Sequence, residues 1–177
     1  MKKPGAMMIA IAAIMIAVTT VFTLLIRVPV PATQGYINFS DVAIYFAAAT
    51  FGPWVGLVAG GLGTALADVL GGYAQFAPLT LLAHGVQGLL AGALARRSAK
   101  PAVLLVAWLA GTAAMVGLYL LGEGLVLTGW GPALVEAPFN LLQNVVGGLV
   151  GIPLYYAVRK AYPPVMRLGR GQTWREE

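Results

Sequence analysis

The chain has 177 residues, of which 59% are hydrophobic and only 10% are charged, and its mean hydropathy is +0.83. A soluble domain of this length normally carries about a quarter charged residues, so the composition excludes an ordinary soluble fold and predicts one membrane-embedded domain. The chain has no cysteine, which excludes disulfides and thiolate metal sites.

Six apolar segments predict an all-α integral membrane protein, a six-helix transmembrane bundle. The expected helices cover roughly residues 6–26, 39–51, 53–71, 76–95, 102–122 and 133–158. A full span needs about 20 residues, so the second and third segments are short. Gly52-Pro53 marks the turn between them, and this pair either spans as short tilted helices or re-enters from one side. The first segment is too long for a signal-peptide core and is expected to be a permanent helix.

Basic residues fall almost entirely at one face of this predicted bundle. Ten of the 11 precede the first helix, link the fourth to the fifth, or follow the sixth: Lys2, Lys3, Arg96, Arg97, Lys100, Arg159, Lys160, Arg167, Arg170 and Arg175. An even number of crossings separates these clusters, so the positive-inside rule predicts that both termini are cytoplasmic. The same pattern disfavours nucleic acid as a partner, despite the net charge of +5. Residues 163–177 form a polar, basic tail for which we expect no role beyond anchoring this orientation.

Small residues line one face of several predicted helices, where they permit close helix packing in lipid. On the first helix Ala6, Ala10, Ala13 and Ala17 form such a stripe. Packing within the bundle is the simpler interpretation of any one stripe. The first-helix stripe is the best candidate for docking a separate membrane subunit, because a terminal helix is more easily left on the outside.

Polar side chains inside the apolar segments are the most informative residues, since each is costly in lipid and tends to be functional. The sixth segment carries Glu136, Asn140, Gln143 and Asn144 on one helical face, and the fourth carries His84 and Gln87 on one face. With a rise of about 1.5 Å per residue, His84 lies roughly 12 Å and Asn144 roughly 16 Å below the outer ends of their helices. The two stripes therefore predict a polar pocket that opens outward. The alternative is that these groups only hydrogen-bond the two helices together.

Four further residues are candidates for the pocket. Asp41 and Asp68 bracket the short pair, and Tyr73 and Trp130 lie in outer links. Asp41 follows Asn38 and Ser40, so it is also a candidate helix N-cap.

The predicted pocket contains no Lys or Arg, and an anionic ligand is normally met by a basic side chain. A neutral or weakly basic ligand fits better, such as a heteroaromatic ring read by amides and stacked on Tyr or Trp. The sequence has no phosphate-binding GxxxxGK[S/T] loop and no serine with a plausible base beside it. The single histidine disfavours a transition-metal site. We therefore expect neither an enzyme nor a bound metal or cofactor.

Several motifs resemble the substrate-binding S components of energy-coupling factor (ECF) vitamin transporters. These are the stretch from Pro31 to Asp41, Phe51-Gly52-Pro53, Gly60-Gly61-Leu62-Gly63 with Ala67-Asp68, and Gly72-Tyr73 through Phe76-Ala77-Pro78. The resemblance covers roughly residues 5–158 and is greatest to the branch with hydroxymethylpyrimidine-type and pyridoxine-type S components, to which a riboflavin group is related. One difference is Gln87, where this branch often has an acidic residue.

This resemblance implies a vitamin site in the outer half, built from the first outer loop, including Asn38, and helices four to six. It implies a membrane coupling subunit, contacted by the Ala-x-x-x-Ala pattern of the first helix, and two cytoplasmic ATPase subunits as partners in a prokaryotic cell membrane. The S component would bind its vitamin from outside and tilt in the bilayer to deliver it. Metal-specific members begin with Met-His, whereas this chain begins Met1-Lys2, so nickel and cobalt are not expected.

Two alternatives remain open on the sequence alone. A membrane scaffold of the rod-shape morphogenesis type shares the S-component fold but needs no outward pocket. A solitary vitamin transporter that works without ATPases has the same sequence features.

Overall fold

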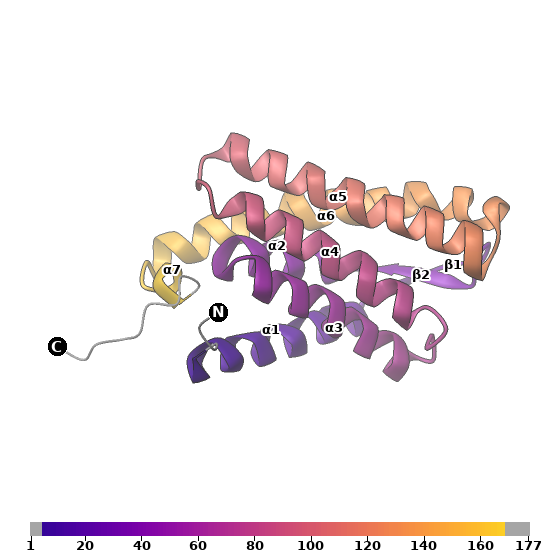
Figure 1. The fold of residues 1–177 in the computed structure, drawn as a ribbon, viewed down its shortest axis with the longest axis horizontal. Coiled ribbons are helices and arrows are strands. Elements are labelled where there is room, and N and C mark those ends of the chain that lie inside the picture. Colours follow the sequence, from indigo (N-terminus) through magenta and orange to yellow (C-terminus); the bar gives the residue numbers. More distant parts are fainter. Residues whose placement is uncertain (1–4, 169–177) are drawn as a thin grey trace.

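The structure is a computed structural model that describes residues 5–168, without the side chains of Met166 and Arg167. Figure 1 shows a bundle of roughly aligned helices with a small β-hairpin at one end. The elements are α1 (Ala6–Leu25), β1 (Arg27–Val30), β2 (Gly35–Asn38), α2 (Ser40–Phe51), α3 (Pro53–Gly71), α4 (Ala77–Ala95), α5 (Pro101–Gly122), η1 (Glu123–Leu127), α6 (Trp130–Ala161) and α7 (Val165–Leu168). Within the described residues, five helices are long and apolar enough to cross a membrane, and α2 is a shorter apolar helix. The protein is thus a helical integral membrane protein.

Several helix ends differ from the predicted ranges, most of all in α6, which extends past 133–158 in both directions. Gly129, at φ 86°, precedes the first residue of α6, and a glycine adopts this backbone conformation at little cost. Arg159 and Lys160 occupy its last turn, where positive charge is favourable beside the helix C-terminus. Smaller differences of one residue occur at the end of α1 and at the starts of α2, α4 and α5.

The first outer loop of the prediction contains a β-hairpin. β1 and β2 pair in antiparallel register from Arg27↔Asn38 to Val30↔Gly35. The turn includes Gln34, which has a positive φ of 58°. The hairpin caps the end of the bundle to which α2 does not reach: 12 residues give a helix of about 18 Å, whereas the hydrocarbon layer is about 30 Å thick.

The links between helices alternate between the two ends of the bundle. The start of α1, the α2–α3 turn, the α4–α5 link and the end of α6 lie at one end, and the hairpin with the α3–α4 and α5–α6 links lies at the other (Figure 1). The first end carries Arg96, Arg97, Lys100, Arg159 and Lys160, so it is the inner end by the positive-inside rule. Lys2, Lys3, Arg170 and Arg175 lie outside the described residues.

Most small-residue stripes serve packing inside the bundle. A Cβ added at Gly88 of α4 would overlap the carbonyl oxygen of Gly56 on α3, and one at Gly60 would overlap that of His84. Similarly, a Cβ at Gly63 would lie 2.7 Å from Cβ of Thr19 on α1. The backbones of α3 and α4 therefore approach each other closely, as small residues allow in lipid.

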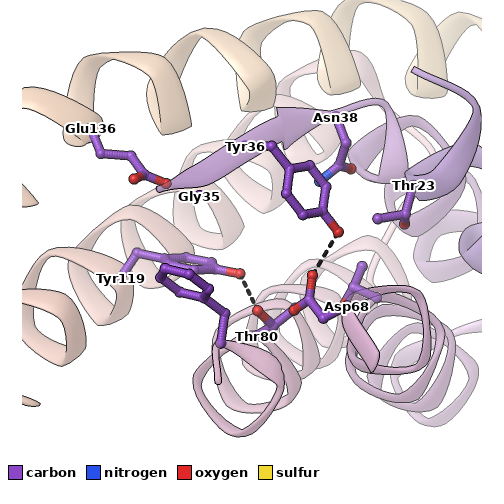
Figure 2. Close-up of a pocket in the computed structure, with 10 residues that line it drawn as sticks. Thr23, Gly35, Tyr36, Asn38, Asp68, Thr80, Tyr119 and Glu136 are labelled. Carbon is purple, nitrogen blue, oxygen red and sulfur yellow. Dashed lines mark hydrogen bonds between the residues drawn. The ribbon is translucent and has the colours of Figure 1, made fainter. Parts of the chain in front are cut away.

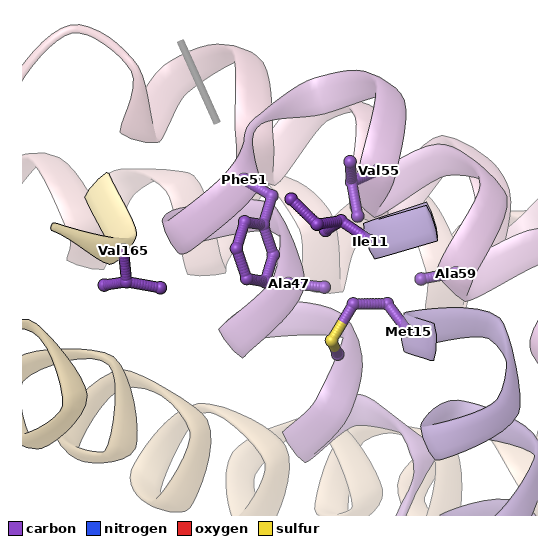
Figure 3. Close-up of a cluster of buried hydrophobic side chains, with 7 residues drawn as sticks. All are labelled: Ile11, Met15, Ala47, Phe51, Val55, Ala59 and Val165. Atoms are coloured by element: carbon purple, nitrogen blue, oxygen red, sulfur yellow. The ribbon is translucent and has the colours of Figure 1, made fainter. Parts of the chain in front are cut away.

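An apolar cluster closes the inner end of the molecule. It joins α1, α2, α3 and α7 through Ile11, Met15, Ala47, Phe51, Val55, Ala59 and Val165 (Figure 3). Since Val165 belongs to this cluster, the first part of the predicted tail is packed on the bundle; residues 169–177 lie outside the described part of the chain.

Candidate functional site

A polar cavity lies at the outer end of the bundle, beneath the hairpin. Its lining comes from α1, β2, α3, α4, α5 and α6: Thr23, Gly35, Tyr36, Asn38, Thr64, Asp68, Phe76, Thr80, Tyr119 and Glu136 (Figure 2). The cavity volume is about 20 Å³, which suffices for a water molecule but is far below the roughly 300–1,000 Å³ of typical ligand pockets. A ligand of vitamin size therefore fits only if part of the wall moves.

The hairpin is the wall element held mainly by side-chain hydrogen bonds. The Tyr36 hydroxyl donates to Asp68 Oδ1 across 2.6 Å, and the Thr33 hydroxyl donates to Glu136 Oε2. The backbone N–H of Asn38 donates to Gln143 Oε1 across 2.6 Å. Burial, and next the Asp68 carboxylate, raise the pKa of the Tyr36 hydroxyl, so this group is a neutral donor at physiological pH. These three bonds tie β2 and the turn to α3 and α6.

Tyr36 also anchors the outer rim of the cavity. Its ring packs against the Tyr73 ring with centroids 4.6 Å apart, and the guanidinium of Arg27 lies 5.3 Å from the centroid of the Tyr36 ring. Arg27 Nη1 also donates to the carbonyl oxygen of Gly71 at the end of α3 across 3.3 Å. The one basic side chain of the described outer face is thus held in structural contacts.

A buried hydrogen-bond network lies deeper in the bundle, further along α4 and α6 than Thr80 and Glu136 of the cavity. Gln87 Nε2 donates to Asp41 Oδ1 across 2.6 Å and to Asn144 Oδ1 across 2.8 Å, while Gln87 Oε1 lies 2.8 Å from His84 Nδ1. Asn144 Oδ1 accepts a further bond from the Tyr45 hydroxyl across 2.7 Å, and its Nδ2 donates to the Asn140 carbonyl oxygen. These residues join α2, α4 and α6.

The sequence-predicted residues thus divide between two places. Asn38, Asp68 and Glu136 line the cavity, whereas Asp41, His84, Gln87 and Asn144 are not among its lining residues and bond to one another between the helices. These bonds are those expected from the alternative interpretation, in which the polar groups only hydrogen-bond the helices together. Direct contact of these four residues with a ligand stays a prediction.

The remaining predicted residues flank these two groups. Gln143 and Asn140 are buried on α6, Tyr73 packs on Tyr36, and Trp130 is 47% exposed at the start of α6. Asp41 is not an N-cap: Phe39 occupies that position, and Asn38 Oδ1 accepts the N–H of Ser40 instead. Asp41 points into the network because its carboxylate is paired with Gln87.

A family model described as the S component of ECF-type riboflavin transporters matches residues 6–160. The chain belongs to this family. An S component is part of a membrane transporter of vitamins or their precursors and not an enzyme.

Two similar proteins extend this comparison. A protein of Pyrococcus woesei described only as an uncharacterized protein in the gap 3′ region is 39% identical over 147 residues, which cover 83% of this chain and 98% of that protein. The thiamine precursor transporter HmpT of Lactococcus lactis subsp. cremoris (strain MG1363) is 33% identical over 136 residues, which cover 76% of this chain and 77% of HmpT. Both alignments cover most of this S component.

The alanine stripe of this S component faces outward. Ala6, Ala10, Ala13 and Ala17 of α1 are all exposed, whereas Ile11 and Met15 on the opposite face are buried. Unlike the glycine stripes of α3 and α4, this one makes no use of its small side chains inside the described bundle.

The sequence did not predict several of the lining residues, each of which has a hydroxyl group or an aromatic ring. They are Thr23, Thr64, Thr80, Tyr36, Phe76 and Tyr119. For the lining residues in helices, their position toward the outer ends of apolar helices could have indicated the site. Among residues 5–168, no group of three or more His, Cys, Asp or Glu side chains is placed to hold a metal ion.

Proposed function

We propose that this S component is the binding subunit of an ECF-type ABC importer and captures a small neutral or weakly basic vitamin or vitamin precursor from outside. Hydroxymethylpyrimidine, pyridoxine and similar heteroaromatic molecules are the favoured ligands. The observation that carries the proposal is the polar cavity at the outer end, whose lining has two carboxylates, Asp68 and Glu136, and no Lys or Arg.

The lining suits such a molecule in two ways. Carboxylate and hydroxyl oxygens accept hydrogen bonds from amino and hydroxyl groups, and the rings of Tyr36, Phe76 and Tyr119 can stack on a heteroaromatic ring. The 33% identity to HmpT, a thiamine precursor transporter, supports a pyrimidine as the first ligand to test. The network of His84, Gln87 and Asn144 would support the floor of the site or contact the ligand once the hairpin opens.

Binding to the purified full-length protein tests this proposal. Isothermal titration with hydroxymethylpyrimidine, pyridoxine and riboflavin should give submillimolar affinity for at least one of them. A carboxylate-bearing vitamin such as biotin should bind much more weakly. A clear preference for the carboxylate ligand would contradict the proposal, because the lining offers it no positive charge.

We further propose that the S component works in a prokaryotic cell membrane with an ECF membrane coupling subunit and two cytoplasmic ATPase subunits. The exposed alanine stripe of α1 supports this, since close helix docking needs small side chains on an open face. After ATP binding, the S component would tilt in the bilayer and release its ligand inward. Affinity purification from the native host should recover the coupling subunit and ATPases. Recovery of this chain alone, with ligand uptake intact, would favour the solitary transporter.

A further inference from the structure

Glu123 is a buried carboxylate that nothing described above uses. It begins η1, the π-helical turn at the end of α5, and its side chain is only 1% exposed. Neither of its carboxylate oxygens receives a hydrogen bond from an N–H or hydroxyl donor, and the side chain that it meets is a second carboxyl group, that of Glu136. Burying an ionisable group without a partner is costly, and buried polar groups in proteins are nearly always paired. The Glu123 carboxylate therefore has acceptor oxygens that could bind a hydrogen-bond donor of a ligand.

The neighbours of Glu123 place it behind the wall of the cavity. Its carboxyl group interacts with that of Glu136, which lines the cavity and is 3% exposed. Tyr119, one helical turn before Glu123, also lines the cavity. Single π-helical turns are frequent at functional sites.

The two carboxyl groups lack a cationic partner in the described part of the chain. No Lys or Arg lines the cavity, and the Arg27 guanidinium is engaged by the Tyr36 ring and the Gly71 carbonyl oxygen. A divalent metal ion normally binds more carboxylate or imidazole ligands than Glu123 and Glu136 supply. The rings of Tyr36, Phe76 and Tyr119, which line the cavity together with Glu136, suit an organic cation.

We propose that Glu123 and Glu136 form a subsite for a protonated amine or amidine group of the ligand. The inference rests on the proposed function, because the ligand enters the same cavity when the hairpin opens. The cationic nitrogen donates to the free oxygens of Glu123 and to Glu136, in place of the Thr33 hydroxyl that Glu136 accepts in this structure. The subsite would make this S component prefer an amine over the matching alcohol.

Two matched probe pairs test the subsite on the full-length protein in lipid nanodiscs. Pyridoxamine and pyridoxine differ by an aminomethyl in place of a hydroxymethyl group, and benzamidinium and benzamide differ by charge. We expect the wild type to bind each cation about tenfold or more tightly than its neutral partner, as one charge-assisted contact provides. Glu123→Gln should abolish this preference and change affinity for the neutral probe less than about threefold. Leu125→Ala, on the same turn and 69% exposed, is the control for damage to η1 and should behave as wild type.

The outcomes separate this inference from the proposed function. If no vitamin binds but benzamidinium raises the melting temperature of the wild type and not of Glu123→Gln, the subsite stands and the vitamin assignment fails. If a vitamin binds and Glu123→Gln keeps the preference for the cation, or weakens both probes equally, the subsite is refuted. An increase in thermal stability of Glu123→Gln with unchanged probe binding also refutes it, because the two carboxyl groups then merely share a proton.

Discussion

Gln87 is the residue on which most of the buried polar network depends. Its amide donates to Asp41 and Asn144 and accepts from His84, so both of its polar atoms are paired with groups on three helices. In a low-dielectric interior such a fully paired group holds its neighbours in one arrangement. Removing it takes one hydrogen bond from each of three buried side chains at once.

Gln87→Leu should therefore lower the stability of the fold. The substitution leaves the buried Asp41 carboxylate without its amide donor, which costs roughly 1–3 kcal/mol. Thermal unfolding in detergent, followed by circular dichroism, measures the effect. Leu82→Ala on the same helix is the control, because Leu82 is 50% exposed toward lipid. Equal melting temperatures for the two variants would show that the network contributes little.

At the scale of residues, amides and charges could be predicted from the sequence and hydroxyls could not. Gln87 and Asn144 stand out in apolar helices and recur at helical spacing, so their meeting was foreseeable. The threonines gave no such signal, because a threonine in a helix can bond its own backbone, as Thr23 does with Thr19 and Thr64 with Gly60. Whether such a side chain also faces a cavity depends on how the helices rotate against each other.

The hairpin is the element that covers the cavity, through Gly35, Tyr36 and Asn38 of β2. Its strands pair only with each other, so its attachment to the bundle rests on side-chain bonds such as Tyr36 to Asp68 and Thr33 to Glu136. A two-stranded hairpin alone is at best marginally stable. Loss of one of these hydrogen bonds should therefore increase the mobility of the hairpin without affecting the helices.

Tyr36→Phe should loosen the hairpin without unfolding the helices. The variant keeps the ring against Tyr73 but loses the bond to Asp68, worth roughly 0.5–1.5 kcal/mol. Hydrogen–deuterium exchange of residues 27–38 should become several-fold faster. Tyr162→Phe, at a 52% exposed inner position, should exchange like the wild type. Unchanged exchange in the hairpin of Tyr36→Phe would mean that its other contacts suffice.

The close packing of α3 against α4 can be tested by enlarging a glycine at the contact. Gly88→Ala would place a methyl group into the Gly56 carbonyl, forcing two backbones apart at a cost of roughly 1–3 kcal/mol. Gly117→Ala on α5 is the matched control, since a Cβ there meets no atom within 4 Å. The control should be neutral or slightly stabilising by helix propensity. Similar melting temperatures for both alanine variants would rule out the close packing.

Elements were predictable where hydrophobic length and Pro or Gly punctuation agree. The turn at Gly52-Pro53 and the extent of α3 follow from these signals. The hairpin did not, because Pro29 removes a ladder donor from β1 and speaks against a strand. The ends of α6 also differ from the prediction, because its first turn contains Gly131 and Pro132, which are typical of a loop, and its last turn contains Arg159 and Lys160, which end the apolar run.

At the scale of the whole molecule, one face of α1 is available for a partner. Ala10→Leu together with Ala13→Leu should reduce co-purification of the ECF coupling subunit several-fold while leaving ligand affinity and melting temperature unchanged, since both positions are exposed. Leu109→Phe on α5, at a position 51% exposed, is the control for enlarging an outward side chain. Full recovery of the complex with the double variant would place the docking face elsewhere.

In the proposed function, the short α2 and the hairpin above it restrict the direction in which the site opens. Backbone groups that leave their partners cannot be solvated by acyl chains, so a displaced β1–β2 pair has to swing up toward the headgroups and water and not sideways between lipids. Bilayer thickness then becomes a control on ligand entry. A membrane with longer acyl chains would raise the headgroup boundary past the strands and slow loading, whereas a thinner one would leave the entrance permanently wet.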